Sequence, residues 1–111
     1  MILSDFARTA KIEGVALARK DGLVVRSKLP KGIDPNIIAA IGAKVVANAE
    51  MVSRELEKGG AKFIHMKASI GDVLIGNGKK IILISLIGKE EELGYLLGEM
   101  ERVIKKLDEL F

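Results

Sequence analysis

Residues 34–60 decide the fold and read DPNIIAAIGAKVVANAEMVSRELEKGG. Asp34 can accept a hydrogen bond from an unpaired amide of a first helical turn, and Pro35 suits the first helical position, where its missing N–H carries no penalty. Gly59 and Gly60 can supply the left-handed backbone with which helices commonly end. The stretch therefore predicts one long helix over residues 35–58.

This helix carries two apolar strips. Larger side chains recur at three- and four-residue steps, so we expect that face to lie on a sheet: they are Ile38, Ile41, Val45, Ala49, Val52 and Leu56. Ala40, Ala43 and Ala47 lie roughly opposite, by the helical rotation of about 100° per residue. Small side chains let two helix backbones approach closely, which favours a contact with a second helix. Alanine is also a good helix former on a solvent-exposed face, and that alternative stays open.

Short β-type segments lie on both sides of the long helix. Before it, apolar runs at 15–18 and 23–26 are separated by Lys20-Asp21-Gly22, and such an Asp-Gly pair predicts a hairpin. After it, residues 63–66, 73–75 and 81–87 are typical of strands, and Asn77-Gly78 predicts a tight turn between the last two. Residues 81–84 are apolar on both faces, which predicts a central strand covered by helices on each side.

Two further helices complete the prediction. Residues 2–10 have helical spacing and end near Gly14, and residues 93–110 keep an apolar register from Leu93 to Leu110. Glu90, Glu91 and Glu92 in the first turn are better explained by the helix dipole than by a metal cluster, and Lys105 and Lys106 suit the other end. We expect an α+β fold in a single domain over residues 1–111, with element order α-β-β-α-β-β-β-α and a five-stranded antiparallel sheet sandwiched between one long helix and the two terminal helices.

Composition limits the classes of protein. The chain has 111 residues, of which 49% are hydrophobic, which suits one packed core and excludes a disordered chain. It has no apolar run long enough for a bilayer and no signal-peptide pattern, so we expect a cytoplasmic protein without membrane contact. The absence of cysteine excludes thiolate chemistry and suits a reducing compartment. Abundant Lys, Glu and Ile favour a thermophile-like composition.

No catalytic motif is recognisable. Gly71 and Gly76 are spaced as in a phosphate-binding loop, but Asn77 follows where a Lys is needed and an apolar strand replaces the helix. Gly76-Asn77-Gly78 likewise lacks the third glycine and the strand-to-helix turn of a dinucleotide site. Ser69 and Asp72 have no recognisable base, and His65 is not spaced with them as a catalytic set.

His65 is the only histidine of the chain. A single imidazole is a poor metal site unless a second subunit supplies its twin. We interpret it as an ordinary strand residue near a subunit contact, where it could respond to pH. The sequence therefore predicts no catalytic residue, no cofactor and no metal site within one chain.

The formal net charge is +3, which raises a nucleic-acid-binding alternative. Lys and Arg are spread through every segment with Asp and Glu among them, so no basic stripe forms. The four aromatic residues show no stacking pattern on a strand. Nucleic acid is therefore the secondary alternative.

The 15–26 hairpin with its Asp21-Gly22 corner, the long helix, and the three closing strands and helix together resemble the roadblock family across the whole chain. The resemblance implies a homodimer, or a heterodimer with a paralogous roadblock-like chain, in which the long helices pack together and the sheets join edge to edge through the strand at 63–66. A dynein light-chain role would presume a eukaryotic motor, which nothing in the sequence supports. The predicted dimer interface comprises Ala40, Ala43, Ala47, Met51, Phe63, Ile64, His65 and Met66.

The resemblance further implies a scaffold or regulator of a small Ras-like GTPase. We expect a non-catalytic dimeric protein-interaction module whose partner contacts are Lys44, Asn48, Arg54 and Glu55, polar residues at the border of the paired helices. Such residues can orient a charged partner. Arg54 could act as an arginine finger on bound GTP, but an arginine on a helix is more often a solvated surface residue. The sequence leaves open which GTPase binds, on which face, and whether hydrolysis is stimulated, inhibited or unaffected.

Overall fold

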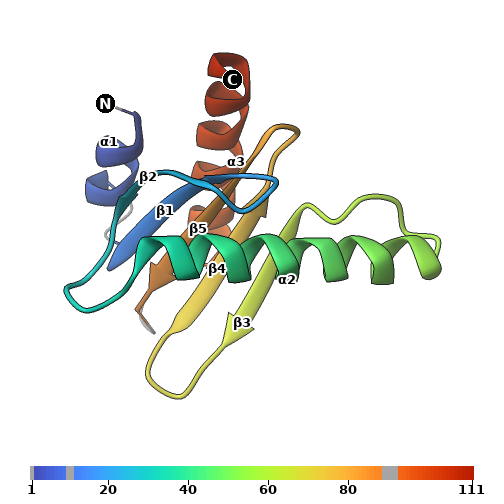
Figure 1. The fold of residues 1–111 in the computed structure, drawn as a ribbon, viewed down its shortest axis with the longest axis horizontal. Coiled ribbons are helices and arrows are strands. Elements are labelled where there is room, and N and C mark those ends of the chain that lie inside the picture. Colours follow the sequence, from blue (N-terminus) through green and yellow to red (C-terminus); the bar gives the residue numbers. More distant parts are fainter. Residues whose placement is uncertain (1, 10–11, 89–92) are drawn as a thin grey trace.

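A computed structural model describes residues 2–9, 12–88 and 93–111. The seven elements from β1 onward follow the order β-β-α-β-β-β-α, and the eight-residue helix α1 precedes them. The strands form one five-stranded antiparallel sheet in the order β2-β1-β5-β4-β3 (Figure 1). The bounds are α1 Ile2–Thr9, β1 Gly14–Arg19, β2 Val24–Lys28, α2 Pro35–Glu55, β3 Phe63–Lys67, β4 Asp72–Asn77, β5 Ile81–Ile87 and α3 Leu93–Leu110.

The central strand is β5, as its continuous apolar run predicts. Successive side chains of a strand point to opposite faces of the sheet. Ile81 and Leu83 therefore join the core on one face, while Ile82 and Ile84 join the core on the other. All four are buried, which confirms the prediction of a strand covered on both sides.

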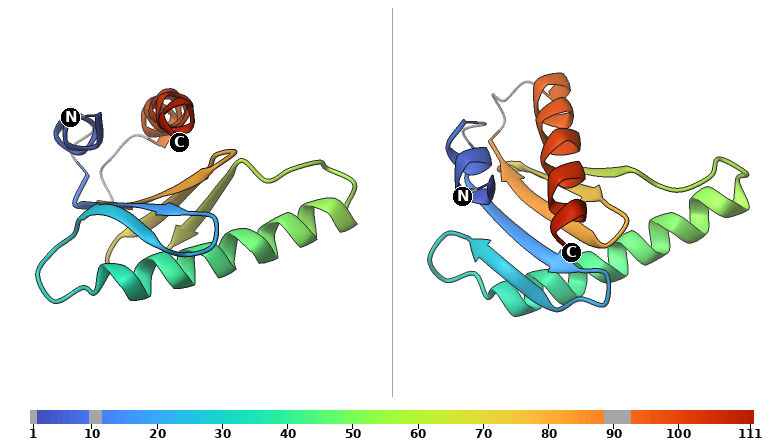
Figure 2. Two further views of the ribbon diagram at one scale, coloured as in Figure 1. Left: turned by 45° about the horizontal axis from the view of Figure 1, so that its top comes forward. Right: turned by 90° about the horizontal axis from the view of Figure 1, so that it is seen from above.

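The helices cover the two faces unequally, as Figure 2 shows. α2 crosses one face alone, and α1 and α3 lie next to each other on the opposite face. Leu3 and Phe6 of α1 are buried in the same cluster as five side chains of α3. Leu110 is 68% exposed, so the apolar register of α3 ends before it, contrary to the prediction. Glu90, Glu91 and Glu92 lie outside the described residues.

The two predicted hairpin turns differ in outcome. Gly22 has a φ of +94°, and Asp21 Oδ1 accepts a hydrogen bond from the amide of Leu23, so the first turn is confirmed. Asn77 does not form the second turn. It is the last residue of β4, and the amide of Gly78 closes the hairpin by donating to the carbonyl of Ile81 at 2.8 Å.

α2 begins as predicted and ends earlier. Asp34 accepts a hydrogen bond from the amide of Asn36 at 2.9 Å, and Pro35 occupies the first helical position. The helix ends at Glu55 and not at 58, because Glu57 already adopts a left-handed backbone with a φ of +57°. Gly59 is also left-handed, but it lies in the connection to β3 beyond the helix end.

Only part of the predicted strip of larger side chains lies on the sheet. Ile38 and Val45 are partly buried and pack against the core beneath α2, as predicted. Ile41, Val52 and Leu56 are 53%, 58% and 64% exposed, so their predicted place on the sheet is wrong. The buried residues are Ala39, Gly42 and Val46. Small residues let the helix approach the sheet closely, since a Cβ on Gly42 would lie only 2.4 Å from Ile84 Cδ1.

None of the helices in the described part of the chain is both long enough and apolar enough to cross a membrane.

Candidate functional site

The outer face of α2 is unusually apolar. Ile37, Ile41, Met51 and Val52 are 55%, 53%, 65% and 58% exposed. Helical spacing places these side chains on neighbouring ridges of the surface that points away from the sheet. The exposed apolar side chains form two pairs, with Lys44 and Asn48 between them on the same face. Exposed apolar patches commonly mark a surface that another protein covers.

The predicted alanine strip divides between two environments. Ala40 and Ala47 are exposed, as a helix contact needs. Ala43 is half-buried and packs against the core cluster beneath α2. It also lies beside the β1–β2 corner, because a Cβ on Gly22 would meet Ala43 Cβ at 3.5 Å. Larger side chains than alanine therefore provide most of the apolar area on the outer face.

The polar residues predicted for partner contact are all exposed on α2. Lys44, Asn48 and Glu55 lie on the same side of the helix as Ile41, by their spacing. Arg54 differs, because its guanidinium lies 3.7 Å from the carboxylate of Glu50, although the arginine side chain is 74% exposed. The structure thus places three of the four beside the apolar surface.

β3 is an edge strand, as predicted. Phe63 and Ile64 are partly buried, whereas His65 and Met66 are exposed. Phe63 packs on the core beneath α3 and Ile64 on the core beneath α2, so alternate side chains point to alternate faces. All five residues of β3 pair with β4 without a shift in register.

The two edges of the sheet differ in their suitability for pairing. In β2 the register with β1 shifts at Val25, where a bulge interrupts the ladder, and the strand carries Arg26 and Lys28. Bulges and charged side chains are devices that protect an edge from another chain. β3 has a regular ladder without a bulge, its middle residues are Ile64, His65 and Met66, and its one Lys, Lys67, is the last residue of the strand. β3 is therefore the edge that can accept a further strand.

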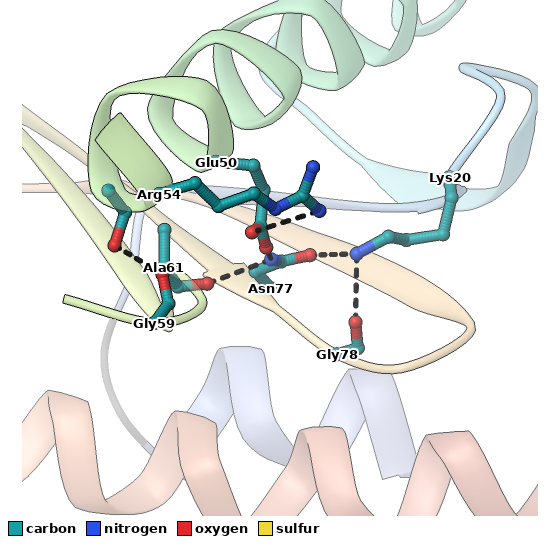
Figure 3. Close-up of polar contacts among 8 residues, drawn as sticks. Lys20, Glu50, Arg54, Gly59, Ala61, Asn77 and Gly78 are labelled. Atoms are coloured by element: carbon teal, nitrogen blue, oxygen red, sulfur yellow. Dashed lines mark hydrogen bonds and ion pairs between the residues drawn. The ribbon is translucent and has the colours of Figure 1, made fainter. Parts of the chain in front are cut away.

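The C-terminal part of α2 extends beyond the β3 edge, as Figures 1 and 2 show. It is attached there through a polar network (Figure 3). The side-chain amide of Asn77 donates to Glu50 Oε1 at 2.6 Å and to the carbonyl of Ala61 at 2.8 Å. Ser53 Oγ donates to the carbonyl of Gly59 at 2.6 Å. The network joins α2, the connection to β3 and the end of β4.

Lys20 joins this network from the β1–β2 corner. Its ammonium donates to Asn77 Oδ1, and to the carbonyl of Gly78 at 2.9 Å. Burial lowers the pKa of Lys20 from its usual range, and the carboxylates of Glu50 and Asp108 oppose that change. Sequence reasoning missed the network because its members come from four separate segments.

A second polar pair lies on β3 and β4. His65 Nε2 is 2.9 Å from Asp72 Oδ2, with side chains 28% and 15% exposed. The hydrogen bond from His65 is the largest cause that lowers the pKa of the Asp72 carboxyl. The hairpin places the two residues diagonally across the ladder, a contact that the sequence analysis did not predict.

A hollow of about 520 Å³ opens between α3 and the start of β3, and two of its charged residues, Arg102 and Asp108, have partners within the domain. Arg102 pairs with Glu99 at 2.7 Å, and Asp108 accepts hydrogen bonds from the amides of Lys79 and Lys80. Within the described residues of one chain, no group of three or more His, Cys, Asp or Glu residues is placed to hold a metal ion.

The fold defines a small α+β domain with one helix across a full face of an antiparallel sheet. The model of the Roadblock/LC7 domain matches residues 1–87, and the chain belongs to this family. An uncharacterized Methanocaldococcus jannaschii protein, MJ0714, is 27% identical over 110 residues, which are 99% of this chain and 93% of that protein.

Solved structures show the same fold. MglB of Myxococcus xanthus superposes with a TM-score of 0.88 at 16% identity, over 96% of this chain and 88% of that one. A Roadblock/LC7 domain from Streptomyces avermitilis has a TM-score of 0.86 at 18% identity, over 98% and 93%. Both structural superpositions extend over α3, which lies beyond the residues that the family model matches.

Proposed function

We propose that this chain is a non-catalytic protein-interaction module that forms a dimer through α2 and β3 and binds a small Ras-like GTPase. The observation that carries the proposal is the coincidence of two unpartnered surfaces on one side of the domain. The apolar outer face of α2 and the regular open edge of β3 adjoin, and α2 extends past that edge.

A two-fold pairing would cover the β3 edge together with the side of α2 that faces the partner's helix. Strand β3 would pair with its twin and continue the sheet, which removes an exposed edge. The part of α2 that extends beyond its own sheet would then lie over the partner's sheet, beside the partner's α2. Met51 and Val52, which lie near the C-terminal end of α2, would lose their contact with water, and burial of apolar area is the main driving force of association.

Family membership supports a role in regulation of a GTPase, because the roadblock resemblance implies such partners. Lys44, Asn48 and Glu55 lie among the exposed apolar side chains of α2, and we place them at the solvent-exposed border of the paired helices in the dimer. Charged and polar groups at the border of an interface chiefly set orientation and association rate. We therefore place the GTPase contact along this border of the paired helices.

The proposed module contributes no catalytic group to its partner. Arg54 is the residue that could act as an arginine finger, but it is an exposed helix residue whose guanidinium lies 3.7 Å from Glu50, as a solvated surface arginine does. A finger must reach the phosphates of a bound nucleotide. We assign Arg54 to support of the α2 end instead.

Light scattering tests the dimer. The chain mass is 12.0 kDa, and a dimer has twice that mass at tens of micromolar. Met51→Glu places a carboxylate in the proposed contact and should yield a monomer, because an unpaired buried charge costs several kcal/mol. Tyr95→Glu, at an exposed position on α3, is the matched control and should remain a dimer. A native monomer, or a dimeric Met51→Glu variant, contradicts the interface.

A binding assay tests the partner. Small GTPases of the source organism, loaded with GDP or a GTP analogue, are titrated with the native protein and with Lys44→Glu. We expect binding of a GTPase that Lys44→Glu weakens, and equal hydrolysis with native and Arg54→Ala proteins. Binding of nucleic acid but of no GTPase contradicts the proposal. If the chain pairs with a paralogous roadblock-like chain and not with a second copy of itself, the dimer is a heterodimer. If Arg54→Ala abolishes accelerated hydrolysis without weakening binding, the module is catalytic.

A further inference from the structure

We propose that the dimer holds an intersubunit binding site for a divalent transition-metal ion such as Zn²⁺, with the two His65 imidazoles as its protein ligands. The inference rests on the proposed pairing of β3 with its twin. It goes beyond that pairing because it fixes which residues meet at the two-fold axis and what they can bind. The site is incomplete in one chain, since each subunit supplies a single imidazole.

The backbone of β3 shows which residues face the free edge. The amide of Asn77 donates to the carbonyl of Lys62 at 2.8 Å, and the amide of Ala68 donates to the carbonyl of Gly71 at 3.1 Å. In an antiparallel ladder, residue pairs that exchange backbone hydrogen bonds alternate with residue pairs that do not. Even-numbered residues from 62 to 68 therefore bond to β4. The N–H and C=O groups of residues 63, 65 and 67 point outward, where a second strand can bond to them.

The faces of the sheet restrict the register of the twin strands. Ile64 packs beneath α2 and Phe63 beneath α3, so the odd-numbered His65 lies on the α3 face. If a two-fold axis places both α2 helices on the same face of the joined sheet, directly opposed residues of the two β3 strands must point to the same face. Odd-numbered residues of one strand then lie opposite odd-numbered residues of its twin, and even-numbered opposite even-numbered. The register that uses all five residues of β3 is centred on His65.

This register also gives favourable neighbours. Ile64 of one strand lies opposite Met66 of the other on the α2 face, so two apolar side chains meet beneath the paired helices. His65 lies opposite its own twin as a hydrogen-bonded pair, with Cα atoms about 5.5 Å apart and both imidazoles on the same face. Side chains of directly opposed residues on one face are in contact distance of each other.

The surroundings of His65 suit a metal ligand. Asp72 Oδ2 lies 2.9 Å from Nε2 and can accept a hydrogen bond from Nε2–H, which leaves the lone pair on Nδ1 free to bind a metal. A carboxylate on the far nitrogen is the usual outer partner of a metal-bound histidine. Two imidazole nitrogens and two waters complete a tetrahedral Zn²⁺ site. The two Asp72 carboxylates balance the two Lys67 ammonium groups on the same face.

The test uses untagged protein, because His65 is then the only histidine in each chain. Zinc is titrated by calorimetry, and the imidazole nitrogens are followed by ¹H–¹⁵N NMR. We expect one Zn²⁺ per two chains and a shift of the Nδ1 resonance. At a zinc concentration about ten times its dissociation constant, the dissociation constant of the dimer should fall by about tenfold, because the metal binds only the dimer.

Two variants separate the site from the dimer. His65→Phe keeps a strand-favouring residue, so in the presence of a chelator it should dimerise as the native chain does. Zinc should not lower the dissociation constant of the dimer of this variant. Asp72→Asn keeps an acceptor but loses the charge, and should weaken zinc binding by about 10- to 100-fold, as loss of an outer-shell partner does.

The outcomes distinguish the two proposals. A native dimer that binds no zinc, or binds it equally after His65→Phe, overturns the metal site and leaves the dimer intact. Zinc bound at one ion per chain without effect on dimerisation also overturns it. A chain that is monomeric both with chelator and with zinc overturns the pairing of β3 itself.

Discussion

The side-chain amide of Asn77, at the end of β4, donates a 2.6 Å hydrogen bond to Glu50 Oε1 on α2. The same amide donates to the carbonyl of Ala61 in the connection between α2 and β3. One carboxamide therefore holds the extended end of α2 at a fixed position relative to the β3 edge. Both parts of the proposed dimer surface depend on that position.

Asn77→Asp tests this attachment. The carboxylate cannot donate to Glu50 or Ala61, and it places a second negative charge beside Glu50. We expect the free energy of unfolding to fall by about 2–3 kcal/mol, since two partly buried acceptors lose their donor. Urea denaturation measures the loss, and Asn48→Asp on the exposed face of α2 is the control that should change stability little.

The pKa of Lys20 gives a pH dependence. Burial lowers this pKa in the folded protein, so the folded state releases the proton at a lower pH than the unfolded state does. Between the folded value and the unfolded value of about 10.4, the unfolded state binds more protons and stability rises with pH. We therefore expect the stability of the native chain relative to Lys20→Gln to increase as the pH is raised toward 10.4. Thermal unfolding at a series of alkaline pH values measures the difference, and a constant or falling difference would contradict the assignment.

Two glycines in helices have opposite expected behaviour. Gly42→Ala directs a methyl group to within 2.4 Å of Ile84 Cδ1 and should destabilise the fold by about 1–3 kcal/mol through overpacking. A Cβ at Gly98, on α3, would have no atom within 4 Å, so Gly98→Ala should stabilise the fold by about 0.5–1 kcal/mol. Chemical denaturation of both variants under one set of conditions compares them. Equal effects would show that α2 does not approach the sheet as closely as described.

The end of α2 offers a stabilising substitution. The amide of Lys58 donates to the carbonyl of Ser53 and that of Glu57 to the carbonyl of Arg54, which together form a Schellman end with Glu57 in the left-handed position. Glu57→Gly should raise the free energy of unfolding by about 0.5–1 kcal/mol, because relief of steric strain exceeds the added chain entropy. Gly59→Ala, also at positive φ, should have the opposite sign. Loss of stability in Glu57→Gly would contradict the helix end.

Much of the fold follows from local signals in the sequence. The apolar run at 81–84 predicts the central strand, Asp21-Gly22 predicts the first hairpin, and Asp34 with Pro35 predicts the start of α2. Each of these depends on a few neighbouring residues whose conformational preferences agree with the final structure. Agreement of local preference with tertiary structure is what makes such predictions succeed.

The orientation of α2 and the polar contacts could not be predicted in the same way. Close approach to Ile84 places the small residues Ala39 and Gly42 on the sheet, so only part of the strip of larger side chains lies there. The contacts of Asn77 with Glu50, and of His65 with Asp72, depend on the relative position of separate elements. Sequence spacing carries no direct information on such distances.

Amide hydrogen exchange of β3 is the most direct test of the proposed pairing through α2 and β3. Ile64 and Met66 bond to β4 in either state, so their amides report the fold alone, and amides on the outer side of β2 give the rate for an unpaired edge. We predict that Phe63, His65 and Lys67 exchange as slowly as Ile64 and Met66, because a twin strand accepts their protons. If Phe63, His65 and Lys67 instead exchange at the rate of the β2 edge while Ile64 and Met66 stay protected, the β3 edge is open. That result contradicts the pairing of β3 with a twin strand.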